Sequence, residues 1–189
     1  MASGVARAQL VPPRETLVVT RSQGVSVRRA SVSDAAIVAP FHLQCWHEAY
    51  AGLVPLDFLD HLDRQDRVQR WRDRLSRNGD TTLLAFDHDA VVGLATVGAS
   101  GDAAPFPPTE VRSLYVARSH QRKGLGRGLL DAALDDTPAS LWVFEDNAGA
   151  RGFYANLGWR PNGERRNDPG TRIPEIRLVR GVSRVDRCG

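Results

Sequence analysis

The segment Gln121 to Gly126, Gln-Arg-Lys-Gly-Leu-Gly, connects a strand-like run at residues 110–116 with a run of helical periodicity. Its glycines leave no Cβ in the way of a ligand, and successive backbone N–H groups in such a turn can point into one concave space. The first turn of the following helix adds unpaired N–H groups and a positive dipole end, which favour an anion. Arg122, Lys123 and Arg127 add positive charge. We therefore expect a phosphate site here, although a plain strand-to-helix turn would also use glycine.

The rest of the chain alternates between strand and helix patterns. Apolar alternation predicts strands at 25–29, 81–86, 91–97, 110–116, 140–144 and 175–179. Helical spacing predicts helices at 35–50 after Ser33, at 56–62, at 66–77, at 125–135, and from an Asn147 cap to Gly158. The segments 98–108 and 161–172 are rich in turn residues and are predicted to be loops, long enough to cover an acceptor as lids. The order β-α-α-β-β-β-α-β-α-β predicts an α/β (α+β) fold, a mixed central sheet with helices on both faces.

Length and composition fit one globular domain. The 189 residues are 42% hydrophobic and 25% charged, which allows one core and little else. We expect this domain at residues 25–182, a mostly disordered leader at 1–24 and a flexible tail at 183–189. No stretch has the roughly 18 to 20 continuous apolar residues of a membrane span, and the N-terminus lacks the pattern of a secretion signal. The expected location is therefore cytoplasmic, with no membrane partner.

Charge and cysteine content argue against two further kinds of site. The formal net charge is only +3, and the arginines at 64–77 are interleaved with aspartates, as on a solvated helix face. We therefore expect no nucleic-acid partner. The two cysteines, Cys45 and Cys188, have neither metal-ligand spacing nor a disulfide framework, so no metal is expected.

Residue spacing distinguishes three kinds of nucleotide site to which the loop from Gln121 to Gly126, called the phosphate loop below, could belong. The loop of ATPases and GTPases needs its lysine after the glycines, whereas Lys123 precedes them, so this alternative fails. A dinucleotide site is a closer rival, because Glu145 follows Gly124 by about 20 residues at the end of a strand. Against it, Leu129 stands where the third glycine belongs, and too few residues follow for the second half of that fold. The third candidate is coenzyme A.

Two segments of the chain resemble the GCN5-related N-acetyltransferases (GNAT). Leu114-Tyr115-Val116, four residues, and then Gln121 to Gly126 look like the acyl-coenzyme A site of that family. Asn147 to Trp159 resembles the second conserved segment of the family, and two independent segments are more specific than either one. The resemblance covers Val25 to Arg180 and implies the GNAT fold with acetyl-coenzyme A as co-substrate. One departure is Arg118, where many members have proline.

The resemblance also implies roles for individual residues. Backbone groups near the end of the strand would pair with the pantetheine arm, the loop amides would hold the pyrophosphate, and an asparagine would contact the coenzyme near its pantetheine. These cofactor-binding positions are Leu114, Tyr115, Val116, Gln121, Arg122, Lys123, Gly124, Leu125, Gly126, Arg127 and Asn147. Tyr154 would stand near the sulfur. Asn147 can equally cap its helix, and Tyr154 can equally fill an apolar stripe.

Glu110 is the candidate general base. It matches the position of the catalytic glutamate in the histone-acetylating branch of the family. Strand alternation would place it on one face with Arg112, Leu114 and Val116. Ribosomal-protein N-terminal acetylators instead have a glutamate five residues before the asparagine, where this chain has Trp142. An exposed or arginine-paired carboxylate explains Glu110 equally well. His47 and His61 are weaker candidates.

By resemblance the protein is an N-acetyltransferase, in which a primary amine attacks acetyl-coenzyme A directly in a ternary complex. The alternatives are a coenzyme A-binding sensor or partner module without catalysis and, more distantly, a polynucleotide-binding protein. The acceptor pocket would include Trp46, His47 and Tyr50, although core packing explains these aromatic residues as well. A small-molecule amine, a peptide N-terminus and a protein lysine all stay open as acceptors, and so does a homodimer.

Overall fold

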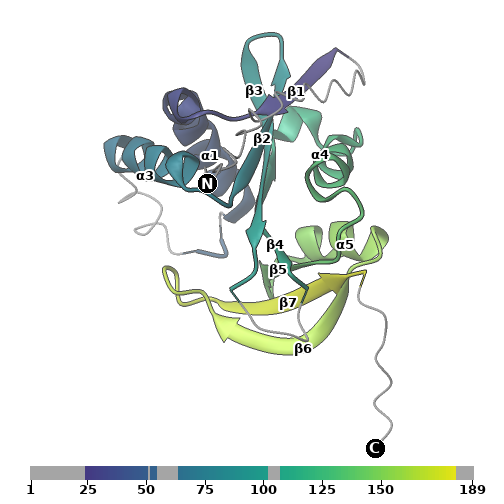
Figure 1. Cartoon of the computed structure of the whole chain (residues 1–189). Coiled ribbons are helices and arrows are strands. Elements are labelled where there is room, and N and C mark those ends of the chain that lie inside the picture. The colour runs from purple at the N-terminus through teal and green to yellow at the C-terminus, as the bar shows by residue number, and fades with distance from the viewer. Residues whose placement is uncertain (1–23, 51, 55–63, 102–106, 182–189) are drawn as a thin grey trace, which may run out of the picture.

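Seven strands form one mixed sheet within the residues that the computed structural model describes, which are 24–50, 52–54, 64–101 and 107–181 (Figure 1). The sheet order is β1-β2-β3-β4-β5-β7-β6, and every neighbouring pair is antiparallel except β4 and β5. The strands are β1 (Val25–Arg29), β2 (Thr81–Asp87), β3 (Ala90–Ala99), β4 (Thr109–Val116), β5 (Ala139–Phe144), β6 (Arg160–Asn167) and β7 (Pro174–Arg180). The helices are α1 (Ala35–Tyr50), α3 (Arg64–Ser76), α4 (Leu125–Leu134) and α5 (Ala148–Asn156).

The predicted element order is confirmed, with one strand added. The predicted helix at 56–62 lies outside the described residues, as do almost all of the predicted leader and the whole predicted tail. The added strand is β6, where a loop was expected, so the prediction of a lid over 161–172 is wrong for most of that segment. Strand β6 is an edge strand whose side chains are mostly exposed, and its sequence of Arg, Pro, Asn, Gly and Glu lacks the apolar alternation that marks a half-buried strand.

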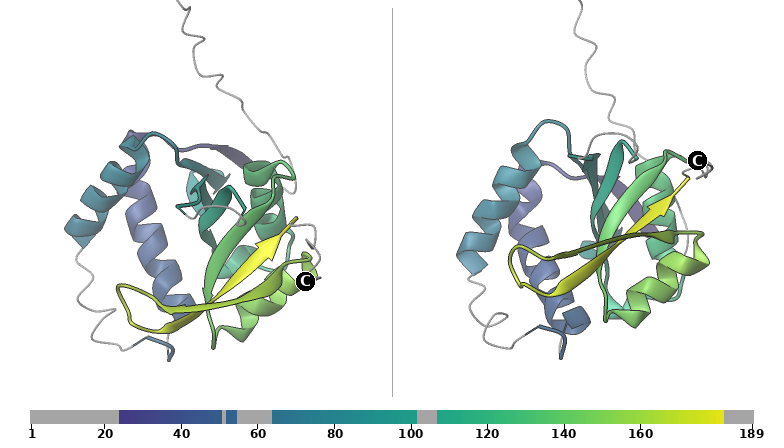
Figure 2. Two further views of the ribbon diagram at one scale, coloured as in Figure 1. Left: turned by 60° about the horizontal axis from the view of Figure 1, so that its bottom comes forward. Right: turned by 90° about the horizontal axis from the view of Figure 1, so that it is seen from below.

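Helices cover both faces of the sheet (Figures 1 and 2). Apolar residues of α1 and α3, among them Val38, Phe41 and Trp71, pack with Leu84 and Leu94 on one face. The leucines of α4 and the aromatic residues of α5 pack on the opposite face. No helix in the described part of the chain is long and apolar enough to cross a membrane.

The entry to α1 is fixed by an ion pair. Arg28 donates two hydrogen bonds to the carboxylate of Asp34, at 2.7 and 2.8 Å, and the backbone N–H of Ser31 donates a third at 2.7 Å. The hydrogen bonds from Arg28 lower the pKa of Asp34 to about 2. The chain thus enters the helical segment through Ser31 and a short 3-10 turn, rather than through the expected Ser33.

The strands β4 and β5 separate soon after they meet. They are parallel and pair only at Thr109 with Ala139 and at Glu110 with Ser140. Beyond this point β4 stays paired with β3, and β5 stays paired with β7. The backbone groups with which β4 faces β5 are therefore left without a strand partner past Glu110. This gap opens the sheet at its centre.

A β-bulge interrupts β4. Two consecutive residues of β3, Thr96 and Val97, pair with Ser113 and Val111, so Arg112 has no partner residue of its own. One extra residue in a strand reverses the alternation of its side chains between the two faces.

The bulge changes which face Glu110 occupies. Glu110 shares a face with Tyr115, which packs among the α1 and α3 residues, whereas Leu114 and Val116 pack toward α4. The expectation that Glu110 shares a face with Leu114 and Val116 is therefore wrong, because strict alternation holds only in a strand without a bulge. The candidate base Glu110 and the loop from Gln121 to Gly126 therefore lie on opposite sides of the sheet.

Candidate active site

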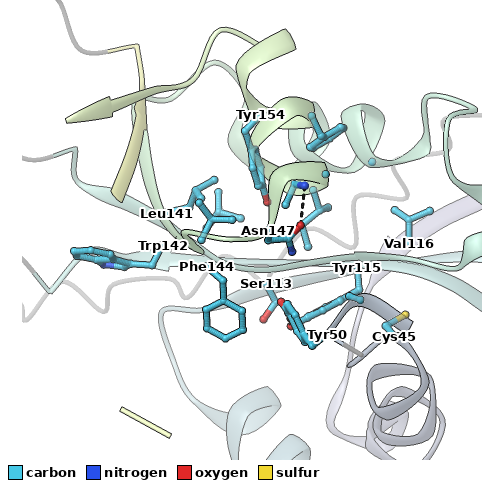
Figure 3. Close-up of a pocket in the computed structure, with 18 of the residues that line it drawn as sticks. Cys45, Tyr50, Ser113, Tyr115, Val116, Leu141, Trp142, Phe144, Asn147 and Tyr154 are labelled. Carbon is cyan, nitrogen blue, oxygen red and sulfur yellow. Dashed lines mark hydrogen bonds between the residues drawn. The ribbon is translucent and has the colours of Figure 1, made fainter. Parts of the chain in front are cut away.

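A cleft of about 900 Å³ occupies the gap between β4 and β5. Residues from both faces of the sheet line it, so the cleft passes between the strands rather than lying on one surface. Figure 3 shows Tyr154 of α5 on one side of the strands, and Tyr50, Tyr115 and Phe144 on the other.

The phosphate loop has the backbone that the sequence predicts. Arg122 and Gly124 have φ angles of 60° and 84°, in the left-handed region, and α4 begins directly afterwards. No side chain caps this helix, so its first N–H groups stay available to a ligand. The side-chain amide of Gln121 donates to the Val116 carbonyl at 3.0 Å and ties the loop to the end of β4.

Most of the predicted loop residues border the cleft. A Cβ on Gly126 would lie 3.3 Å from Cζ of Phe153, so glycine allows α4 and α5 to approach closely here. Gly126 lines the cleft together with Gln121, Arg122, Gly124 and Arg127. Lys123 and Leu125 do not line it: Lys123 is exposed, and Leu125 packs against the core below α4.

Asn147 and Tyr154 both reach the cleft from α5. The Oδ1 atom of Asn147 accepts the backbone N–H of Ala150 at 3.0 Å, so Asn147 does cap this helix (Figure 3). The ring of Tyr154 packs against Phe153 and Trp159, with ring centroids 5.1 and 5.6 Å apart. Its hydroxyl has no hydrogen-bond partner among the described residues. Burial raises the pKa of Tyr154, so the phenol keeps its proton at neutral pH.

Glu110 lines the cleft and is only loosely paired. Its Oε1 lies 3.8 Å from NH1 of Arg112, too far for a hydrogen bond. Arg112 is held more tightly elsewhere, by Asp80 Oδ1 at 3.1 Å and by the Ala99 carbonyl at 2.8 Å. The Glu110 carboxylate can therefore accept a proton without breaking a short ion pair.

Aromatic residues form the wall of the cleft on the α1 side. The rings of Trp46 and Tyr50 lie 4.9 Å apart between centroids, and the rings of Tyr50 and Phe144 are equally close. The hydroxyls of Tyr50 and Tyr115 are 3.4 Å apart, and burial raises the pKa of both phenols.

Neither alternative base is brought to the cleft, and the cysteine that lines the cleft is not an active nucleophile. His47 is exposed and lies outside the cleft, and His61 is outside the described residues. Cys45 is buried and lines the cleft, and burial raises its pKa to about 12, so it is not an active thiolate.

Sequence reasoning missed the cleft residues that come from β5, β6 and β7 and from just after β6, among them Trp142, Arg166, Asp168 and Glu175. Glu175 is buried, its Oε2 accepts a hydrogen bond from Nε of Arg166 at 2.8 Å, and the guanidinium of Arg166 lies 4.1 Å above the Trp142 ring. No local motif marks these residues. They meet because β5, β7 and β6 pair side by side, and the sequence of β6 has no apolar alternation that could have marked it as a strand.

Comparisons with known proteins agree with this geometry. The family model described as the acetyltransferase (GNAT) family matches residues 45–159. The chain is 28% identical over 148 residues to the probable N-acetyltransferase Rv2775 of Mycobacterium tuberculosis, covering 76% of this chain and 84% of that one.

Two solved structures share the fold. PaiA N-acetyltransferase from Thermoplasma acidophilum, in complex with coenzyme A, has a TM-score of 0.66 at 17% identity and covers 82% of this chain and 97% of its own. YncA from Salmonella typhimurium, with its cofactor acetyl-CoA, has a TM-score of 0.59 at 20% identity. The match covers 87% of this chain and 99% of YncA. The predicted GNAT fold is thereby confirmed.

Proposed function

Because the chain belongs to the acetyltransferase (GNAT) family and is an acyltransferase, we propose that it moves the acetyl group of acetyl-CoA to a primary amine in a ternary complex. The observation that carries this proposal is the cleft between β4 and β5. It joins a phosphate loop on one side of the sheet to a loosely paired carboxylate on the other. PaiA and YncA, which share the fold, carry coenzyme A and acetyl-CoA.

The residues of the α4 side suit acetyl-CoA as the donor. The free N–H groups at the start of α4, together with Arg122 and Arg127, would hold the pyrophosphate. The unpaired edge of β4 at Leu114 to Val116 would hold the pantetheine arm, in the manner of an added strand. The thioester would then lie in the gap near Tyr154.

The acceptor amine would approach from the α1 side. Its nitrogen bonds to the thioester carbon as the C–S bond breaks, its proton passes to Glu110, and the departing thiolate takes a proton from Tyr154. A backbone N–H of β4 near Val116 would stabilise the oxyanion. The bulge at Arg112 supports this division, since it turns Glu110 away from the side chains of Leu114 and Val116.

The base has the larger task. A lysine-like amine has a pKa of about 10.4, so its neutral form costs about 4.6 kcal/mol at pH 7, against about 2 kcal/mol for a cysteine-like thiol of pKa about 8.5. We therefore expect Glu110→Gln to lower kcat by roughly 10²- to 10⁴-fold at neutral pH and to recover in part at alkaline pH.

Free-thiol release measured across a panel of amines, with the wild-type protein and Glu110→Gln, tests the proposal. Glu145→Gln is the matched control, because Glu145 also pairs with an arginine, Arg165 at 2.7 Å, and lies outside the cleft. An unchanged pH–rate profile for Glu110→Gln would assign the base to another group or a water chain. Coenzyme A binding without turnover of any amine would favour a non-catalytic binding module.

A further inference from the structure

Carboxylates outnumber guanidinium groups on the acceptor side of the cleft. The carboxylates that line this side are those of Glu48, Glu110, Asp168 and Glu175. The guanidinium groups that line it are those of Arg112 and Arg166. Arg112 also pairs with Asp80, outside the cleft, so part of its charge is neutralised there. The acceptor side therefore carries an excess of negative charge, which favours a cationic ligand and opposes a carboxylate.

Glu175 presents a free oxygen to this space. The residue is 7% exposed, and Arg166 engages its Oε2 at 2.8 Å. Its Oε1 has no hydrogen-bond partner among the described residues, although the side chain borders the cleft. A carboxylate oxygen on a largely buried side chain is stabilised when a charged donor completes its hydrogen bonding. An ammonium group entering the cleft would supply that donor.

The two carboxylates Glu175 and Glu110 are near enough to influence each other. Burial raises the pKa of Glu175 against the lowering effect of Arg166, and the charges of Asp168 and Glu110 raise it further. Like charges at close range destabilise each other unless a cation lies between them. A ligand with two positive charges would relieve both.

The aromatic wall suits the rest of such a ligand. Burial raises the pKa of Tyr50, and the carboxylates of Glu175 and Asp168 raise it further, so the negative field extends to this wall. The rings of Trp46, Tyr50 and Phe144 supply apolar surface for a methylene chain and π faces for an ammonium.

We infer that the acceptor is an aliphatic diamine or polyamine, in which one amine is acetylated beside Glu110 while a second, charged amine binds Oε1 of Glu175. This inference rests on the proposed function and names the acceptor class for the same site. Glu175 thereby acts as a specificity-determining residue.

Three amines of equal chain length isolate the second charge: putrescine, n-butylamine and γ-aminobutyrate, which differ only at the far end. With the full chain and saturating acetyl-CoA, we expect kcat/KM for putrescine to be about tenfold higher than for n-butylamine, which is the effect of one charge-assisted hydrogen bond. We expect the difference between putrescine and γ-aminobutyrate to be larger still. Glu175→Gln should lower the putrescine value about tenfold, mainly through KM, and the n-butylamine value far less. Glu145→Gln should alter neither.

Calorimetric binding of putrescine to the coenzyme A-saturated protein separates the two proposals. Turnover of n-butylamine or γ-aminobutyrate as good as that of putrescine would overturn the inference and leave acetyl transfer standing. So would a putrescine preference that survives Glu175→Gln. Putrescine binding that Glu175→Gln weakens, without turnover of any amine, would refute the transfer and overturn the diamine as acceptor, and would leave Glu175 only as an ammonium-binding residue. If putrescine is neither bound nor turned over, the inference is overturned.

Discussion

Replacing Tyr154 by phenylalanine removes the proposed proton donor and little else. The hydroxyl has no hydrogen-bond partner among the described residues, and the ring contacts with Phe153 and Trp159 are kept. We therefore expect the free energy of unfolding to change by less than about 0.5 kcal/mol. Expelling an unprotonated thiolate of pKa about 8.5 at pH 7 costs about 2 kcal/mol, so kcat should fall by up to about 30-fold.

The dependence on pH distinguishes this role from simple packing. Burial raises the pKa of Tyr154, so the phenol itself does not titrate in the working range, and the defect should follow the thiol instead. Single-turnover thiol release should show the full defect near neutral pH and only a few-fold defect above about pH 9. A defect of equal size at every pH, or no defect at neutral pH, would refute the reasoning. A lowered melting temperature would attribute the loss to packing.

Further substitutions test three separate features. Asp34→Asn should cost about 1 to 2 kcal/mol of stability at neutral pH, because the pKa of Asp34 is lowered to about 2 and the partner Arg28 is 41% exposed. Denaturant titrations should show the difference in stability between wild type and variant vanish as the pH falls from about 4 to 2. Gly126→Ala should weaken coenzyme A binding about tenfold in calorimetry, whereas Gly128→Ala, with open space around its Cβ, should not. Asn147→Ala should lose about 1 kcal/mol of stability and Asn147→Ser should retain it, so a raised KM for acetyl-CoA in the serine variant would isolate coenzyme contact from capping.

Local sequence patterns were sufficient for most elements of the fold. Buried strands and amphipathic helices each bury a periodic set of side chains, so 81–86, 91–97 and 140–144 were recognisable without knowledge of their partners. Strand β6 was not, since it lies at the edge of the sheet and buries almost nothing. The pairing of β6 with β7 places Arg166 beside Glu175, and it thereby forms the part of the cleft that the sequence did not reveal.

The sequence by itself determined the backbone of the Gln121 to Gly126 loop, because glycines and a helix start act within a few neighbouring residues. It also determined Asn147 as a cap, for the same local reason. Only the tertiary structure decided which way Glu110 faces, because the bulge at Arg112 exists in the register between β4 and β3. The cleft itself depends on the separation of β4 from β5, and the carboxylates of its acceptor side come from segments far apart in the chain. Such long-range pairing leaves no trace in any one segment.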